Sequence, residues 1–143
     1  MKTTTYEFDH VVVSYFPDSQ YLKITWKGVI DSEKMGHGYR LALDIIKLHP
    51  VSQCLIDMRG RELAAAGTEP LITDIFGQLL TIIRIPMFVA LVLQPEAYFN
   101  ITDHFHYEYL QQGDNHFVII KHFLNEETAE EWLTASARSF PEA

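Results

Sequence analysis

The chain has 143 residues, 48% hydrophobic and 21% charged, with a formal net charge of -8 at pH 7. This composition is typical of a folded protein, and the length predicts a single domain over residues 1–143. The negative charge argues against nucleic acid and anionic membranes as partners. No apolar stretch reaches the ~20 residues of a membrane span, and the one cysteine, Cys54, suits a reducing compartment. We therefore expect a cytoplasmic protein.

The first part of the chain predicts a β-hairpin and then a helix. Residues 11–16 (VVVSYF) and 21–28 (YLKITWKG) are β-rich runs, and the turn-forming residues PDSQ separate them. Asp31 is placed as a helix N-cap. The helix is expected to end near His49, because Pro50 follows.

Two features of this first helix indicate tight packing. Ile30 and Met35 flank the expected cap at the spacing of a hydrophobic staple. Gly36 and Gly38 weaken the first turns by about 1 kcal/mol each relative to alanine. We therefore expect another part of the chain to approach the helix closely at these glycines.

Strands and helices alternate through the rest of the chain. The remaining strands are predicted at residues 51–58, 87–93 and 116–123. The remaining helices are predicted at residues 68–84, 100–113 and 125–137. The predicted order is β-β-α-β-α-β-α-β-α, which is an α/β fold with about four helices. Its five-stranded sheet is mixed but mostly parallel, and the N-terminal hairpin supplies the one antiparallel edge.

This order, together with the segments YLKITWKGVIDSEKM, CLIDMRG and NEETAEEWL, resembles the SpoIIAA-like proteins. That superfamily includes the STAS domains of anti-sigma factor antagonists and of anion transporters. The chain is most similar to the bacterial STAS/SEC14-like branch, over nearly its whole length. The resemblance implies a SpoIIAA-like fold and a non-enzymatic protein-binding or regulatory module.

This chain departs from the phosphorylation motif of the family. In the antagonists, a strand ending in Asp leads to a loop with Asp-Ser-Ser-Gly, and phosphorylation of the serine controls binding of a partner kinase. Here the strand LIDMRG matches, but the corresponding loop reads AAAGT, without the acidic residue and the serine. Thr68 is left as the candidate phosphoacceptor, at a helix N-terminus where added phosphate would be stabilised. A threonine at this position is also a common helix cap.

Asp57 is the most informative single residue of the sequence. Ligands of open α/β sheets bind outside the carboxyl ends of the strands, and Asp57 is expected at such an end. A carboxylate beside two guanidinium groups either orients a ligand or fixes the turn, and the sequence leaves both readings open. The candidate ligand or partner crevice consists of Asp57, Arg59, Arg61, Thr68, Tyr98 and Phe99.

Other chemistry-bearing residues lack the neighbours that catalysis or metal binding requires. His104 and Glu108 are spaced to share a helix face, but no third ligand is identifiable, so no metal site is predicted. Cys54 lies in an apolar run, where thiols are usually inert. Asp57 lacks the acidic pair with which receiver domains hold magnesium. No nucleotide-binding or hydrolase motif occurs, so we expect neither a cofactor nor an enzyme.

Three functional hypotheses remain. The first is a binding module whose partner is another protein or a second copy of the chain, as a homodimer. The second is a carrier or sensor of a small apolar or lipid-like ligand, with the aromatic segment 98–109 and the helix 68–84 as walls. The third is an enzyme that uses Asp57 and the nearby arginines. Fold alone does not decide among them.

Overall fold

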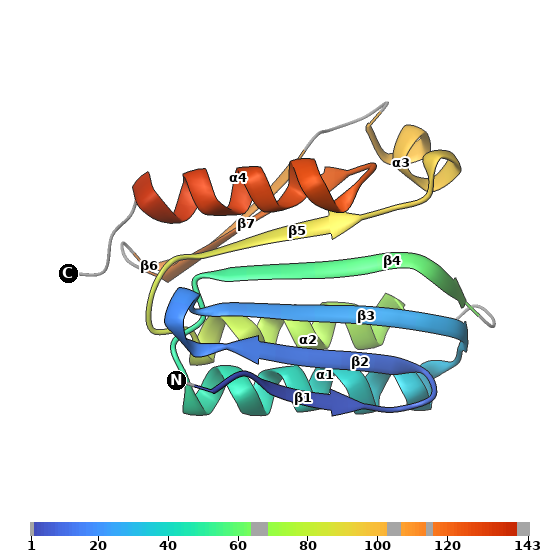
Figure 1. Ribbon diagram of the computed structural model, residues 1–143, viewed down its shortest axis with the longest axis horizontal. Helices are drawn as coiled ribbons and strands as arrows, with labels where there is room; N and C mark the ends of the chain where they lie inside the picture. The colour runs from blue at the N-terminus through green and yellow to red at the C-terminus, as the bar shows by residue number, and fades with distance from the viewer. Residues whose placement is uncertain (1, 64–68, 103–106, 114–115, 140–143) are drawn as a thin grey trace.

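The structure is a computed structural model that describes residues 2–63, 69–102, 107–113 and 116–139. The strands in the described part are β1 (Thr4–Glu7), β2 (Val11–Phe16), β3 (Tyr21–Ile30), β4 (Gln53–Leu63), β5 (Met87–Val92), β6 (Tyr107–Gly113) and β7 (His116–Phe123). Its α-helices are α1 (Ser32–Leu48), α2 (Glu69–Ile82), α3 (Pro95–Thr102) and α4 (Glu126–Ser139). Strands and helices alternate along most of the chain (Figure 1), which confirms the predicted α/β class.

The strands of the described residues form one sheet in the order β1-β2-β3-β4-β5-β7-β6. The four strands β3, β4, β5 and β7 are parallel, and β2 is antiparallel to β3, as the hairpin prediction requires. The prediction of five strands and one antiparallel edge was wrong. Antiparallel strands extend the sheet at both edges, with β1 next to β2 and β6 next to β7. The strand β1 was missed because its four residues are all exposed and show no apolar alternation.

The predicted helix over residues 100–113 was also wrong. The helix α3 begins earlier, at Pro95, and ends at Thr102, and β6 then runs from Tyr107 to Gly113. The strand forms because it completes a hairpin with β7, in which Gly113 lies opposite His116. The sequence GDN at residues 113–115 is a hairpin signal that helical spacing concealed.

Helices cover the two faces of the sheet unequally. Figure 1 shows α1 and α2 on one face and α4 on the other, where α4 packs against β4, β5 and β7. Neighbouring residues of β4 illustrate the alternation: Leu55 belongs to the core under α4, and Ile56 belongs to the core under α1 and α2. The central strand β5 is buried on both sides, as its uniformly apolar sequence predicts.

Local signals set the two ends of α1 as predicted. The Asp31 carboxylate accepts a hydrogen bond of 2.8 Å from the backbone N–H of Lys34, and α1 ends at Leu48, two residues before Pro50. Ile30 and Met35, the expected staple, are both fully buried. These contacts fix the direction in which α1 leaves β3.

The same capping chemistry begins the last helix. The side-chain oxygen of Asn125 accepts a 2.9 Å hydrogen bond from the backbone N–H of Thr128, at the first turn of α4. Ala129 and Leu133 of this helix are fully buried against the sheet. The cap therefore fixes where α4 starts, directly beyond the carboxyl end of β7.

Candidate functional site

The strand β4 does not end at Asp57, contrary to the prediction. It continues to Leu63, five residues beyond the predicted end at Met58. Asp57 nevertheless occupies a boundary in the sheet, because it is the last residue of β4 that pairs with β5, opposite Val92. Beyond this point β4 pairs only with β3 among the described strands. Asp57 thus lies at the carboxyl end of β5, the position that the crevice prediction required.

The carboxylate of Asp57 is held by Arg59. Oδ1 accepts hydrogen bonds from the backbone N–H of Arg59 and from its Nε, both at 3.0 Å, and Oδ2 accepts one from Nη2 at 2.9 Å. The Asp57 side chain is 12% exposed and that of Arg59 is 41% exposed. This bidentate geometry is the strong form of the arginine–carboxylate pair.

These contacts change the pKa of Asp57. Burial acts to raise it, but the hydrogen bonds from Arg59 and the positive charges of Arg59 and Lys23 together outweigh burial, so the pKa is lowered below its ordinary value. Asp57 is therefore ionised throughout the neutral range. Its oxygens already accept three hydrogen bonds, which makes the carboxylate a poor candidate for a general base.

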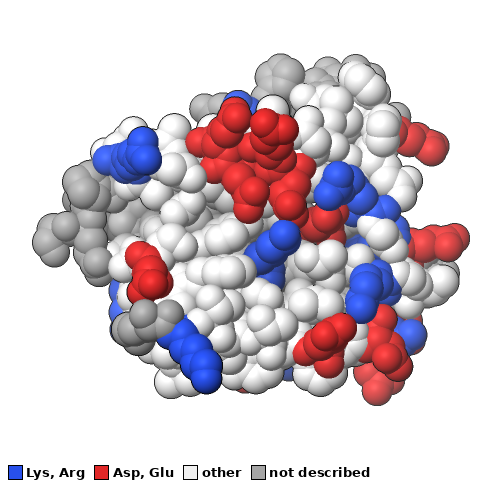
Figure 2. Space-filling model, in the orientation of Figure 1, with Lys and Arg blue, Asp and Glu red and all other residues white. Residues whose placement is uncertain are grey.

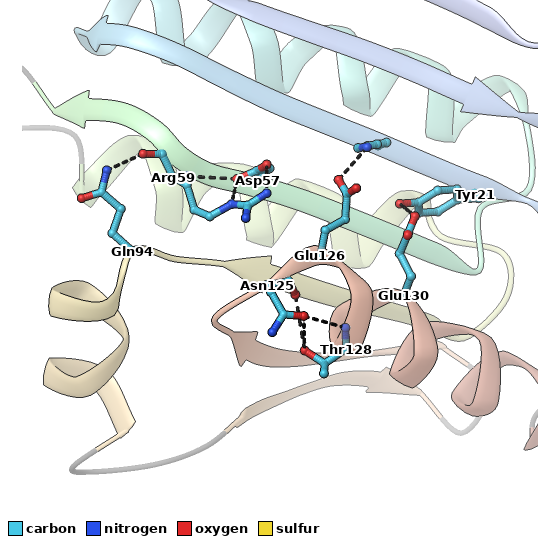
Figure 3. Close-up of polar contacts among 9 residues, drawn as sticks. Tyr21, Asp57, Arg59, Gln94, Asn125, Glu126, Thr128 and Glu130 are labelled. Carbon is cyan, nitrogen blue, oxygen red and sulfur yellow. Dashed lines mark hydrogen bonds and ion pairs between the residues drawn. The ribbon is translucent and has the colours of Figure 1, made fainter.

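Further contacts join this pair to the surrounding elements (Figure 3). Lys23 of β3 forms a 2.6 Å ion pair with Glu126, at the first turn of α4. The hydrogen bond to Asp57 raises the pKa of the Arg59 guanidinium, and the negative charge of Glu126 adds to this rise. The side-chain amide of Gln94, just before α3, donates a hydrogen bond to the backbone carbonyl of Arg59. The Asp57–Arg59 pair therefore lies where β3, β4, α3 and α4 meet.

Arg61 does not belong to this group, although the sequence placed it there. The register between β3 and β4 shifts by one residue between the pairs Thr25–Asp57 and Lys27–Gly60, so β4 carries a bulge. Beyond the bulge, the Arg61 guanidinium lies 5.9 Å from the ring centre of Trp26, a residue of the core that α1 and α2 cover. The bulge thus sends the two arginines to opposite faces of the sheet.

The two aromatic residues of the predicted crevice both lie on α3. Tyr98 is half-buried, and its ring meets that of Phe99 edge-on, with the centroids 5.3 Å apart. Phe99 is 58% exposed, and Leu124, which follows β7, is 38% exposed. Because α3 contacts β7 and Gln94 contacts Arg59, these side chains belong to the same carboxyl edge of the sheet as the Asp57–Arg59 pair.

Several predicted residues fall elsewhere. Thr68 and His104 lie outside the described residues. Glu108 is in the strand β6, so the helical face that it was expected to share with His104 does not form. Within the described part of the chain, no group of three or more His, Cys, Asp or Glu residues could hold a metal ion. Cys54 is 4% exposed, and burial raises the pKa of its thiol to about 12.

Two further features lie outside the predicted crevice, and the second includes residues of α2, which was expected to form one wall of an apolar pocket. Figure 2 shows an acidic patch over α4, which contains Glu126, Glu127, Glu130 and Glu131. An apolar cavity of about 40 Å³ lies between the sheet and the helices α1 and α2. Its lining includes Tyr39, Ala42, Cys54 and Leu79 and has no polar surface. The cavity depends on how two distant helices meet the sheet, which no local pattern encodes.

The chain matches no protein-family model, no curated protein and no solved structure. The SpoIIAA-like resemblance therefore stays a prediction. None of the helices in the described part of the chain combines the length and apolar character needed to cross a bilayer.

Proposed function

We propose that this chain is a non-enzymatic protein-binding or regulatory module of the bacterial cytoplasm, STAS-like in kind, whose partner is another protein or a second copy. The partner is proposed to dock at the carboxyl edge of the parallel strands. The observation that carries this proposal is the 58% exposure of Phe99 on α3, the helix that directly follows Gln94 and its hydrogen bond to Arg59. Aromatic and arginine side chains are enriched in the cores of protein interfaces.

The chemistry of this edge favours binding over catalysis. The Asp57 carboxylate is occupied by Arg59, and the backbone of Arg59 is in turn held by Gln94. Such cross-links keep a surface in one shape before a partner arrives, which lowers the entropic cost of association. Phe99 and Leu124 add apolar area at the same edge.

The size of the apolar cavity favours a protein partner over a lipid cargo. About 10–15 Å³ of such space holds one water-sized group, so the 40 Å³ between α1, α2 and the sheet holds about three. A lipid chain is several times larger. Carriage of a lipid would therefore require α1 or α2 to move away from the sheet.

Affinity capture from the source cells tests the proposal. Tagged wild-type protein is compared with Phe99→Glu and with the control Leu48→Glu, since Leu48 is 73% exposed at the far end of α1. We expect only the Phe99→Glu protein to lose the captured partner or the second copy. Equal capture by all three proteins, or capture of nothing by wild type, contradicts the proposal.

A further inference from the structure

A pair of histidine rings joins the first hairpin of the sheet to the helix α1. His10 lies in the turn between β1 and β2, and His37 lies in the second turn of α1. Nε2 of His10 and Nδ1 of His37 are 3.1 Å apart, although the two residues are 27 positions apart in the sequence. Two ring nitrogens of separate elements therefore converge on one point near the surface.

The backbone that carries these two rings is held by hydrogen bonds of its own. The backbone N–H of Phe8 donates to the carbonyl of Val11 at 2.9 Å, which closes the turn around His10. The backbone N–H of Lys27 donates to the carbonyl of His10, also at 2.9 Å, and so joins the turn to β3. His37 lies on a helix that is capped at its start. The fold itself therefore brings the two rings together.

The Phe8 ring packs against both imidazoles. It meets the His37 ring edge-on, with the centroids 4.7 Å apart, and its centroid lies 6.1 Å from that of His10. Such contacts restrict the rotation of the imidazoles. Less side-chain freedom is then lost when the two rings bind a shared ligand.

The charges around the pair favour a cation. The negative charges of Asp9 and Asp31 and the positive charge of Lys34 act on His10. Two carboxylates thus oppose one ammonium group. Among the described residues, no third His, Cys, Asp or Glu completes a group of three that could hold a metal ion. The described chain therefore offers two nitrogen ligands and a negative surrounding charge.

We propose that His10 and His37 together bind one divalent transition-metal ion of the zinc, nickel and copper class, with water in the remaining positions. Two metal–nitrogen bonds of about 2.0–2.1 Å that span the 3.1 Å between the nitrogens enclose an angle of about 100° at the metal. This angle lies between those of octahedral and tetrahedral coordination. Imidazole is a preferred ligand of these three metals.

Metal binding replaces the hydrogen bond between the two rings. A neutral imidazole carries its single hydrogen on either nitrogen, so each ring can keep that hydrogen on the nitrogen away from the metal. A small rotation of each ring then points both lone pairs at the ion. The bound ion ties the hairpin of β1 and β2 to α1. The site shares no residue with the partner surface around Phe99.

A calorimetric titration of the chelator-treated protein with zinc chloride tests the two ligands. Wild type is expected to show saturable binding. His10→Gln and His37→Gln are each expected to weaken it about tenfold or more, because even the loss of an outer-shell partner of a metal ligand costs this much. Glutamine still forms hydrogen bonds, so these variants keep a polar contact between the turn and the helix.

A third histidine supplies the matched control. His49 is exposed directly after α1, so His49→Gln is expected to bind zinc as wild type does. Circular dichroism checks that each variant is folded. Wild-type affinity in a folded His10→Gln or His37→Gln protein, or no saturable binding by wild type, would overturn the proposal.

Long-range proton–nitrogen NMR spectra of the histidine rings test the geometry in the wild-type protein itself. Zinc is expected to bind through Nε2 of His10 and Nδ1 of His37 and to leave the His49 ring unchanged. Magnesium chloride is expected to change neither ring, because magnesium prefers oxygen ligands. Binding through the other nitrogen of either ring, a response confined to other histidines, or an equal response to magnesium would contradict the site.

Discussion

Among the described helical glycines, Gly38 is the one where an added methyl group is expected to destabilise the fold most. A Cβ atom there would lie 2.5 Å from Cη2 of Trp26, with two further ring atoms at 3.1 and 3.2 Å. Trp26 is fully buried and cannot move aside. Overpacking of this severity costs about 3 kcal/mol, and the gain in helix propensity returns about 1 kcal/mol. Gly38→Ala should therefore lower the free energy of unfolding by about 2 kcal/mol.

The other helical glycines supply matched controls. A Cβ atom at Gly77 meets nothing within 4 Å, so Gly77→Ala should raise the free energy of unfolding by about 1 kcal/mol. At Gly36 the nearest atom is Nη2 of Arg40 at 2.8 Å, the end of an exposed side chain that can move, so Gly36→Ala should not destabilise. Urea unfolding followed by circular dichroism measures all three. A Gly38→Ala protein as stable as wild type would refute the contact with Trp26.

Two substitutions and one labelling experiment test individual contacts. Asp57→Asn should destabilise the fold by about 1–2 kcal/mol at neutral pH, because a neutral amide accepts weaker hydrogen bonds from Arg59 than the carboxylate does. Since the pKa of Asp57 is lowered in the fold, its stabilisation is present above the ordinary carboxyl pKa and lost below about pH 4. Urea midpoints should therefore fall more steeply with acidification in wild type than in Asp57→Asn, and parallel curves would disprove the effect. Asn125→Ala should cost about 1 kcal/mol in the same unfolding assay, through loss of the cap on Thr128; no loss would mean that the cap is not stabilising. The Cys54 thiol should react with a thiol reagent only on unfolding, and fast labelling of the native protein would contradict its burial.

Features set by short-range interactions could be predicted from the sequence. Asp31 caps α1, the hairpin of β2 and β3 forms around the expected turn, and the apolar run of β5 is buried on both faces. The close approach expected at Gly38 also occurs, against Trp26. In the first three cases the residues that decide the structure lie within one turn of sequence or follow a simple periodicity.

Features set by long-range pairing could not be predicted in the same way. The local sequence of β6 does not clearly favour a helix or a strand. Its antiparallel pairing with β7 makes it a strand. The bulge in β4 arises from its register against β3, and it alone separates Arg61 from Arg59. The sequence therefore located Asp57 and Arg59 correctly as neighbours but placed Arg61 on the wrong face of the sheet. Gln94 and Glu126 gave no signal, because only the fold brings them to Arg59.

Native mass spectrometry of the gently purified protein tests the proposed binding function most directly. For wild type and Leu48→Glu, we predict the mass of two polypeptides, either this chain with a partner or two copies of it. For Phe99→Glu, we predict the mass of the single chain. Wild-type protein that is a monomer under these conditions, or a Phe99→Glu assembly that is identical to that of wild type, would contradict a binding surface at the carboxyl edge of the sheet.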